Sequence, residues 1–401
     1  MQRSRVGSLL AALAILSAAA PAAAQDRQEA KHETKQEPKQ HEAPWYERVQ
    51  IRGYGQVRYN RIGATNPHLR NTQADRSIGE PGGIFLRRAR IALTAEPVWF
   101  LTIYLQPDFA SAIEDTLNTQ VLRDWYADVF FDREKQFRLR AGQSRVPFGW
   151  ELLQSSQQRL TLDRSDPLNS AFINERDIGV HLAYTPHAMR EVYRRLANPR
   201  DKGTGDYGLA TVGLINGQAL NTRERNDNKH FVARLAVPIE LGSQAIELAG
   251  GGYTGLYVPT VGEGFTASRR EIRDLRMHGT FVLYPRPFGL QAEYNAGVGP
   301  ELVGKRIEER PLDGGYVMAT LRVPTESFGT FYPYVRVMRY DGGKKFETNA
   351  PRHEVRELNA GIEWQISRWL ETTAEYMESV RTVNGAREAG RLLRLQLQFT
   401  F

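Results

Sequence analysis

The sequence predicts an all-β fold, a 16-stranded antiparallel transmembrane β-barrel. Three observations predict it: strict alternation in the last strand, the return of alternating segments along the chain, and a regular order of short and long links. At the C-terminus, one face takes Leu393, Leu395, Leu397, Phe399 and Phe401, and the other takes Arg394, Gln396, Gln398 and Thr400. A strand with one apolar and one polar face suits a wall between lipid and a wet lumen. This segment alone also allows a strand of a soluble sandwich.

Sixteen segments of roughly ten residues, the length that a tilted strand needs to cross a membrane, show this period of two. They span residues 49–60, 84–96, 100–110, 122–131, 136–143, 176–185, 207–215, 229–237, 244–256, 270–284, 288–298, 315–323, 330–340, 354–366, 370–380 and 391–401.

The links between these segments alternate in length. Short ones, such as 97–99 and 285–287, are followed by long polar ones, such as 111–121, 144–175, 299–314 and 381–390. This order is typical of a barrel with short turns at one end and long loops at the other, and an even strand number returns both chain ends to the same side. The link 186–206 departs from it, because it falls where a short turn is expected. Its 188–197 stretch has the pattern of a small amphipathic helix.

Composition and targeting signals agree with an exported barrel. The 401 residues are 41% apolar and 25% charged, with a formal charge of +7 and no cysteine. No long apolar run follows the N-terminus, which excludes a helical membrane bundle. Residues 1–24 have the basic start, apolar core and A-x-A end of a cleavable signal peptide. We therefore predict a polar periplasmic segment at 25–46, the barrel domain at 47–401, and a location in the outer membrane.

The alternation also predicts which side chains face the lumen. Only nine of the 53 basic residues are lysines, so the positive charge there is almost entirely arginine. Fixed positive charges in a narrow pore favour anions. Arginines that only pair with carboxylates and stiffen the wall are the alternative. The arginines predicted to point inward are Arg52, Arg58, Arg88, Arg90, Arg138, Arg140, Arg234, Arg276, Arg322, Arg336 and Arg394, and the acids are Asp128, Asp177, Glu293, Glu363, Glu371 and Glu375.

Aromatic residues near strand ends predict a girdle at the membrane interfaces. These residues are Trp45, Tyr46, Trp99, Tyr284, Trp364 and Trp369.

Signatures of enzymes fail on inspection. Residues 203–208 fit G-x-G-x-x-G, but a strand follows where a dinucleotide fold needs a helix. Residues 142–146 lack the second glycine of a nucleophile elbow. The eight histidines have no metal-ligand spacing. We predict no catalytic residues, no metal and no cofactor, and no nucleic-acid partner.

The stretch 137–156, FRLRAGQSRVPFGWELLQSS, together with Asp163-Arg-Ser165, 176–180 (RDIGV) and 85–91 (FLRRARI), resembles the phosphate-selective porin O and P family. The resemblance implies a homotrimeric outer-membrane channel whose third outer loop, here 144–175, folds into the lumen as a constriction. It also implies an anion site that includes Arg87 and Arg88, and lysines that attract phosphate. The outer loops offer mainly Lys305, Lys344 and Lys345.

The sequence and the resemblance together predict a passive, anion-preferring porin for phosphate or related small oxyanions, seated in outer-membrane lipid. A general or differently selective porin, an outer-membrane hydrolase and a secreted soluble β-protein are the alternatives. Either Asp124 or Asp128 is expected to accept a hydrogen bond from a protonated phosphate. The predicted pore-lining residues are Arg52, Arg58, Arg87, Arg88, Arg90, Asp124, Asp128, Arg138, Arg140, Arg336 and Arg394.

Overall fold

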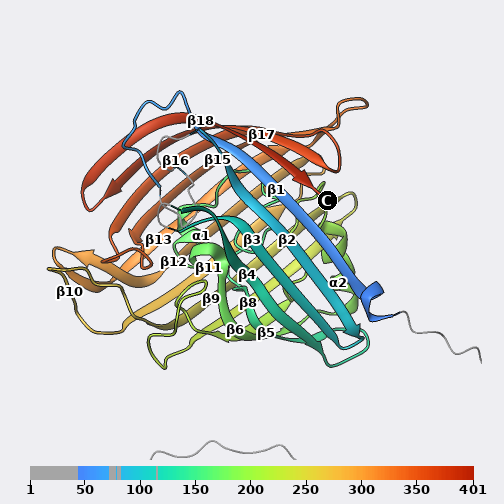
Figure 1. The fold of residues 1–401 in the computed structure, drawn as a ribbon, viewed down its shortest axis with the longest axis horizontal. Helices are drawn as coiled ribbons and strands as arrows, with labels where there is room; N and C mark the ends of the chain where they lie inside the picture. Colours follow the sequence, from blue (N-terminus) through green and yellow to red (C-terminus); the bar gives the residue numbers. More distant parts are fainter. Residues whose placement is uncertain (1–43, 72–77, 79–82, 114–115) are drawn as a thin grey trace, which may run out of the picture. The chain divides into compact units, whose positions relative to one another are not determined.

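The computed structural model describes residues 44–71, 78, 83–113 and 116–401, and its long strands close into a barrel (Figure 1). β1 (Val49–Ile62) pairs with β2 (Ile84–Val98) on one side and with the last strand, β18 (Ala386–Thr400), on the other. All pairings between the long strands are antiparallel. Closure leaves no sheet edge whose polar backbone groups would face lipid.

Thirteen further long strands complete the ring of sixteen: β3 (Leu101–Ile113), β4 (Thr116–Phe130), β5 (Phe137–Arg145), β6 (Arg176–Tyr184), β7 (Ala210–Ile215), β8 (His230–Leu241), β9 (Gln244–Tyr257), β11 (Ile272–Leu283), β12 (Phe288–Val303), β13 (Arg306–Leu321), β15 (Thr330–Gly343), β16 (Arg352–Gln365) and β17 (Leu370–Val383). Two-residue strands, β10 (Thr266–Ala267) and β14 (Val323–Pro324), lie beside β13 and β15. The predicted fold class is confirmed.

The helices are short: η1 (Trp45–Arg48), α1 (Asp166–Asn169), η2 (Ile173–Glu175) and α2 (His187–Leu196). Within the described part of the chain, no helix has the length and apolar character needed to cross a membrane. α2 is the small helix predicted in the 186–206 link. The predicted signal peptide, 1–24, and residues 25–43 of the polar segment lie outside the described residues.

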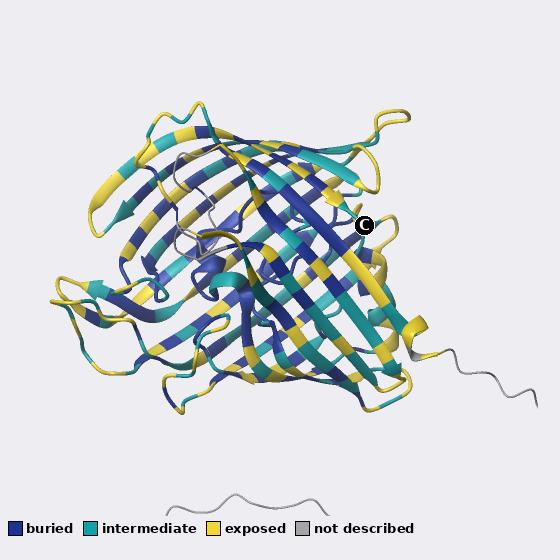
Figure 2. Cartoon of the chain, viewed as in Figure 1, coloured by how far each residue is buried: buried dark blue, intermediate teal, exposed yellow. Residues whose placement is uncertain are grey.

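Buried and exposed residues alternate along the strands, as the period-two pattern predicts (Figure 2). On β18, Leu393, Leu395 and Leu397 are exposed on the outside, whereas Arg394 and Gln396 are buried on the inside. An outer apolar face and an inner polar face follow from this alternation.

Three links predicted as long loops are instead paired hairpins. β12 and β13 stay in register from Phe288 to the pair Val303–Arg306, through residues predicted as the 299–314 loop. β17 and β18 pair out to Val383 and Ala386, and the turn between them is Asn384-Gly385, with φ values of 47° and 89°. Such a turn matches the twist of two antiparallel strands. β3 and β4 likewise reach the pair Ile113–Thr116. Beyond the lipid both faces are wet, so the alternation ends while the hydrogen-bond ladder continues.

The aromatic girdle is partly present. Trp99, Trp369 and Tyr46 are exposed, but Tyr284 is almost fully buried inside the barrel. Its hydroxyl donates to Glu247 at 2.7 Å, so its prediction as an interfacial residue is wrong. Tyr284 has the same parity as the inward residues of β11, and that alternation continues one residue beyond the strand.

The seam where the barrel closes is built from glycine and phenylalanine. Gly53 and Phe401 exchange two backbone hydrogen bonds, of 3.0 and 2.9 Å. Opposite Phe399 lies Gly55, and a Cβ added at Gly55 would be 2.2 Å from the Phe399 ring. The ring therefore lies directly over the glycine and covers the space that a side chain would fill.

The loop 144–175 folds into the barrel, as the resemblance implies. Its Val146, Phe148, Leu152, Leu160, Leu168 and Phe172 pack in one buried cluster with wall residues such as Tyr253 and Tyr316. Glu293 of β12 accepts hydrogen bonds from the backbone N–H groups of Trp150 (2.5 Å) and Glu151 (2.7 Å). The hydroxyls of Tyr316 and Thr280 also donate to Glu293, each at 2.9 Å. One carboxylate thus fastens the loop to the wall.

Replacing Gly55 by valine is expected to displace the Phe399 ring and weaken the seam. Overpacking of this kind costs about 1–3 kcal/mol, so the barrel should lose its folded, fast-migrating form at a lower temperature in detergent gels. Gly279→Val is the matched control, because nothing lies within 4 Å of a Cβ built at Gly279. Equal melting of the two variants would contradict the role assigned to the Phe399 ring.

Replacing Glu293 by alanine is expected to release the loop from the wall. Two buried amides would lose their acceptor, at a cost of about 1–3 kcal/mol each. Single-channel recordings should then show a larger and noisier conductance than those of the wild type. Glu309→Ala is the control, since this carboxylate pairs with the exposed Arg273 at 2.8 Å. An unchanged conductance in Glu293→Ala would argue against Glu293 as the anchor.

Candidate anion pathway in the barrel lumen

The structure places all eleven predicted pore residues on the inner face of the wall. Ten of them are buried between the wall and the internal segments: Arg58, Arg87, Arg88, Arg90, Asp124, Asp128, Arg138, Arg140, Arg336 and Arg394. Arg52 is exposed and lines a cavity inside the barrel. Their contacts decide what each of them can do.

A β-bulge turns two neighbouring arginines inward. Gln56 pairs with Arg88 and Val57 pairs with Leu86, which leaves Arg87 as the extra residue of β2. A bulge reverses the alternation for one step, so Arg87 and Arg88 are both buried on the inside while Leu86 is exposed outside. Simple alternation assigns only Arg88 to the lumen. The resemblance therefore identified Arg87 where the period-two pattern did not.

A second bulge brings in Arg123, which sequence reasoning missed. Gln106 pairs with Asp124 and Pro107 pairs with Leu122, so Arg123 is the extra residue of β4. Its guanidinium lies 3.5 Å from Asp108 and donates to Asn174 of the loop at 2.8 Å. Proline has no N–H for the ladder and is found at bulges. Pro107 in the neighbouring strand was the available signal.

Three arginines of the wall converge on one carboxylate of the loop. Arg58 and Arg87 lie 3.0 and 3.1 Å from Oδ1 of Asp163, and Arg394 contacts its Oδ2. Burial alone would raise the pKa of Asp163, but the attraction of Arg58, Arg394 and Arg87 lowers that pKa well below its usual range. Arg394 also pairs with Glu375. We call Arg58, Arg87, Arg394 and Asp163 the Asp163 cluster.

Arg336 joins the loop to the wall, and all three of its guanidinium nitrogens donate hydrogen bonds. Its guanidinium donates to Glu151 at 2.9 Å, to the Thr161 hydroxyl at 3.1 Å and to the Asp163 carbonyl at 3.0 Å. It also donates to Asn359 of the neighbouring strand. These contacts agree with the alternative in which an arginine stiffens the wall.

The two candidate aspartates are also engaged. Asp128 takes two hydrogen bonds from Arg140, at 2.7 and 2.8 Å, with Arg138 at 3.9 Å. Asp124 pairs with Arg176 at 2.9 Å. Both carboxylates thus balance arginines of the wall, as Asp108 does for Arg90 at 2.7 Å.

Other arginines donate hydrogen bonds to neutral oxygens. Arg159 donates to the carbonyls of Thr161 and Leu162, both at 2.8 Å. Arg145 donates to the Leu153 carbonyl and, at 3.3 Å, to the Tyr207 hydroxyl. Arg88 donates to the Gln56 side chain at 2.7 Å.

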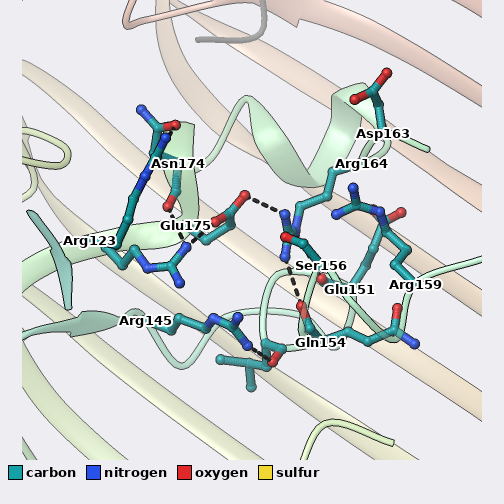
Figure 3. A network of polar contacts seen from close by, with 12 residues as sticks. Arg123, Arg145, Glu151, Gln154, Ser156, Arg159, Asp163, Arg164, Asn174 and Glu175 are labelled. Carbon is teal, nitrogen blue, oxygen red and sulfur yellow. Dashed lines mark hydrogen bonds and ion pairs between the residues drawn. The ribbon is translucent and has the colours of Figure 1, made fainter. Parts of the chain in front are cut away.

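Inside the loop, Arg164 joins its two arms (Figure 3). It donates to Glu175 at 2.5 Å and to the Gln154 carbonyl at 2.7 Å. Glu175 in turn pairs with Arg176 at the start of β6. This network fixes the shape of the loop before any solute arrives.

The link 186–206 reaches the same loop from the opposite end, where the short turns lie. Lys202 forms a buried ion pair with Glu363 of β16, and its carbonyl accepts from Gln154 of the loop at 2.7 Å. Asp201 makes a bidentate pair with Arg286, at 2.7 and 2.9 Å. Burial opposes ionisation, but the hydrogen bonds from Arg286 and Asn198 lower the pKa of Asp201. Loop and link together narrow the lumen.

Two cavities flank the end of the loop, and Gln157 and Gln158 line both. One, of about 380 Å³, lies against β1–β5 and the end of the 186–206 link. The other, of about 1060 Å³, opens among the short turns and is lined by Arg200, Arg286, Arg322 and Arg368 with Asp201 and Glu371.

Two of the three lysines that were expected to attract phosphate are buried in ion pairs. Lys344 pairs with Asp166 at 2.5 Å and Lys345 pairs with Asp274, and both side chains are buried. Only Lys305 of the three is exposed. The positive charge that a solute meets in the lumen is therefore mainly arginine.

Comparisons with known proteins agree with this architecture. The outer-membrane channel DcaP of Acinetobacter baumannii is 13% identical, with 88% of this chain and 97% of that chain covered and a TM-score of 0.54. OmpF of Salmonella typhi, solved as a complex with daunomycin, is 11% identical over 88% and 97% of the two chains, with a TM-score of 0.52. At this identity the likeness shows the fold alone. A comparison with curated protein sequences gives no match.

The family model described as phosphate-selective porin O and P matches residues 70–401. That is most of the chain and all of the pore-lining residues except Arg52 and Arg58. The match, the closed 16-stranded wall and the loop folded into the lumen agree with one another. This chain belongs to the phosphate-selective porin O and P family, and it is an outer-membrane porin, a channel and not an enzyme.

Proposed function

We propose that this porin is a passive, anion-preferring diffusion channel for phosphate or related small oxyanions. The observation that carries the proposal is the Asp163 cluster. Its three guanidinium groups converge on Asp163, and Arg394 also pairs with Glu375. This concentration of guanidinium groups lies at the loop, where the lumen is narrow and water screens charge least.

Arginine supplies the chemistry that an oxyanion needs. Its charge does not titrate in any relevant range, and its planar fork can give a phosphate two parallel hydrogen bonds. The bulge in β2 sets Arg87 and Arg88 side by side on the inner face. We assign the phosphate contact to this pair, as the resemblance of the sequence to this family implies. The other predicted residues contribute to the positive potential of the lumen or stabilise the wall.

A general porin without phosphate specificity is the second candidate. The buried Lys344 and Lys345, and the pairing of Arg90, Arg140 and Arg336 with carboxylates, favour it. Both candidates use the same barrel, and the effect of phosphate on the current separates them.

We extend the proposal to targeting and assembly on the strength of the sequence. Residues 1–24 direct export and are removed, 25–46 form a polar periplasmic segment, and the barrel assembles as a homotrimer in outer-membrane lipid. The short turns then face the periplasm, since both chain ends lie at that side.

The reversal potential in a planar bilayer under a KCl gradient tests the proposal. The wild type should give a reversal potential close to that of an ideal chloride channel, and millimolar phosphate should lower the conductance. Arg87→Gln with Arg88→Gln should lower the chloride-to-potassium permeability ratio by about fivefold for each lost charge, because one unit charge at 4 Å in water is worth about 1 kcal/mol. Arg58 and Arg394 still balance Asp163 in this variant.

Arg339→Gln is the matched control. Arg339 lies on the outer wall, where it pairs with Asp313 and is largely exposed, so its loss should not change selectivity. A wild-type potential on the cation side would show that the inward arginines are neutralised, and the anion proposal would fail. An anion potential with no response to phosphate would favour the general porin.

A further inference from the structure

The smaller cavity combines tyrosine rings with arginines, and no role assigned so far uses the rings. It lies between the wall at β1–β5, the loop residues 155–158 and the end of the 186–206 link. Its aromatic lining is Tyr54, Tyr104, Tyr126 and Tyr207, and its arginines are Arg52, Arg90, Arg140 and Arg145. The Asp163 cluster does not line it.

The rings are held in a fixed stack. Tyr104 and Tyr126 are stacked, with ring centroids 5.1 Å apart and planes 23° apart. The guanidinium carbon of Arg140 lies 3.8 Å from the centroid of Tyr126 and 5.8 Å from that of Tyr207. Asp128 grips the same guanidinium with two hydrogen bonds. A ring entering the cavity would therefore meet aromatic surfaces already in place.

The tyrosine hydroxyls are turned to polar partners. The hydroxyl of Tyr54 accepts from Arg90 at 2.9 Å, and that of Tyr104 accepts from Gln106 at 3.0 Å. The hydroxyl of Tyr207 accepts from Arg145 at 3.3 Å. Three of the four hydroxyls thus accept from a nitrogen donor, and the rings add apolar surface to the lining of the cavity.

Two arginines of the cavity have no ion-pair partner among the described residues. Arg52 has no hydrogen bond or ion pair with any residue in the described ranges, and Arg145 donates to neutral oxygens only within those ranges. The carboxylates that line the cavity are engaged elsewhere: Asp124 with Arg176 at 2.9 Å, and Asp206 with Arg138 at 3.8 Å and Arg190 at 3.9 Å. An anionic group is favoured beside Arg52 and Arg145.

We propose that this cavity is a subsite for anions in which a planar aryl ring carries a carboxylate or phosphate group. Arg52 and Arg145 take the oxyanion, and the tyrosines contact the ring. About 380 Å³ lies in the range of small-molecule pockets, about 300–1,000 Å³, and exceeds what one inorganic oxyanion fills. The inference rests on the proposed function, because an aryl anion must first be drawn into the lumen.

The test compares two carboxylates of equal charge and similar size, benzoate and cyclohexanecarboxylate, as blockers of chloride current through the purified porin in planar bilayers. Only benzoate has a planar π-system. Because cyclohexanecarboxylate is the more hydrophobic of the two, simple partitioning would favour it. Aromatic pairs add roughly 0.5–1.5 kcal/mol, so benzoate should block at a concentration about two- to tenfold lower. Phenyl phosphate and cyclohexyl phosphate repeat the comparison with the other oxyanion, and an aryl preference in either pair supports the subsite.

Two variants separate the ring contact from the charge. Tyr104→Leu should bring the half-blocking concentrations of benzoate and cyclohexanecarboxylate together. Arg52→Gln should raise both by about fivefold and leave their ratio unchanged. Tyr294→Leu, on the exposed outer wall, is the matched control and should behave as the wild type does.

Equal block by the aryl and cyclohexyl anions in an anion-selective wild type would overturn the subsite and leave the proposed function standing. An aryl preference that survives Tyr104→Leu would overturn it as well, since the ring contact would lie elsewhere. A wild-type reversal potential on the cation side would overturn the proposed function and the subsite together.

Discussion

The structure depends on one constraint: the hydrogen-bonded wall must close. β1 and β18 are the first and last strands, and their register joins Tyr54 to Thr400 and Gly55 to Phe399. Once the ring is closed, every strand must send alternate side chains to lipid and to the lumen. The polar lumen of this protein follows from closure, and so do the problems that its buried charges create.

In a lumen that is lined with arginine and filled by a loop, both the charged side chains and the backbone groups of the loop need partners. Burying an unpaired charge costs several kcal/mol, and unsatisfied backbone groups add more. Carboxylates and carbonyls of the loop point outward to the wall, where they accept hydrogen bonds from arginines that point inward. Arg336 shows both kinds of contact at once, because it reaches the Glu151 carboxylate and the Asp163 carbonyl. Most inward arginines are therefore structural, and the selectivity of the pore must come from the few whose charge exceeds that of their partners.

The alternation predicted all sixteen long strands, the wide 144–175 link and the helix in the 186–206 link, because period and link length are local properties. It failed where the local pattern stops carrying the information. Arg87 and Arg123 face inward because bulges break the alternation, and a bulge depends on the partner strand as much as on its own. The hairpin of β12 and β13 continues beyond the lipid, where no apolar face marks it. Ion-pair partners such as Arg58 and Asp163 are 105 residues apart, and nothing in a single sequence joins them.

The depth of the charges explains why one lumen can hold two kinds of site. On β1, Arg58 belongs to the Asp163 cluster and Arg52 to the tyrosine-lined cavity. They are six residues apart on the same face, about 20 Å at roughly 3.3 Å per residue. The two positive regions therefore lie at different depths of the lumen. A small oxyanion needs only the first, where guanidinium groups crowd together. A larger anion with a ring gains from the second, and such a difference lets one channel select by shape after it has selected by charge.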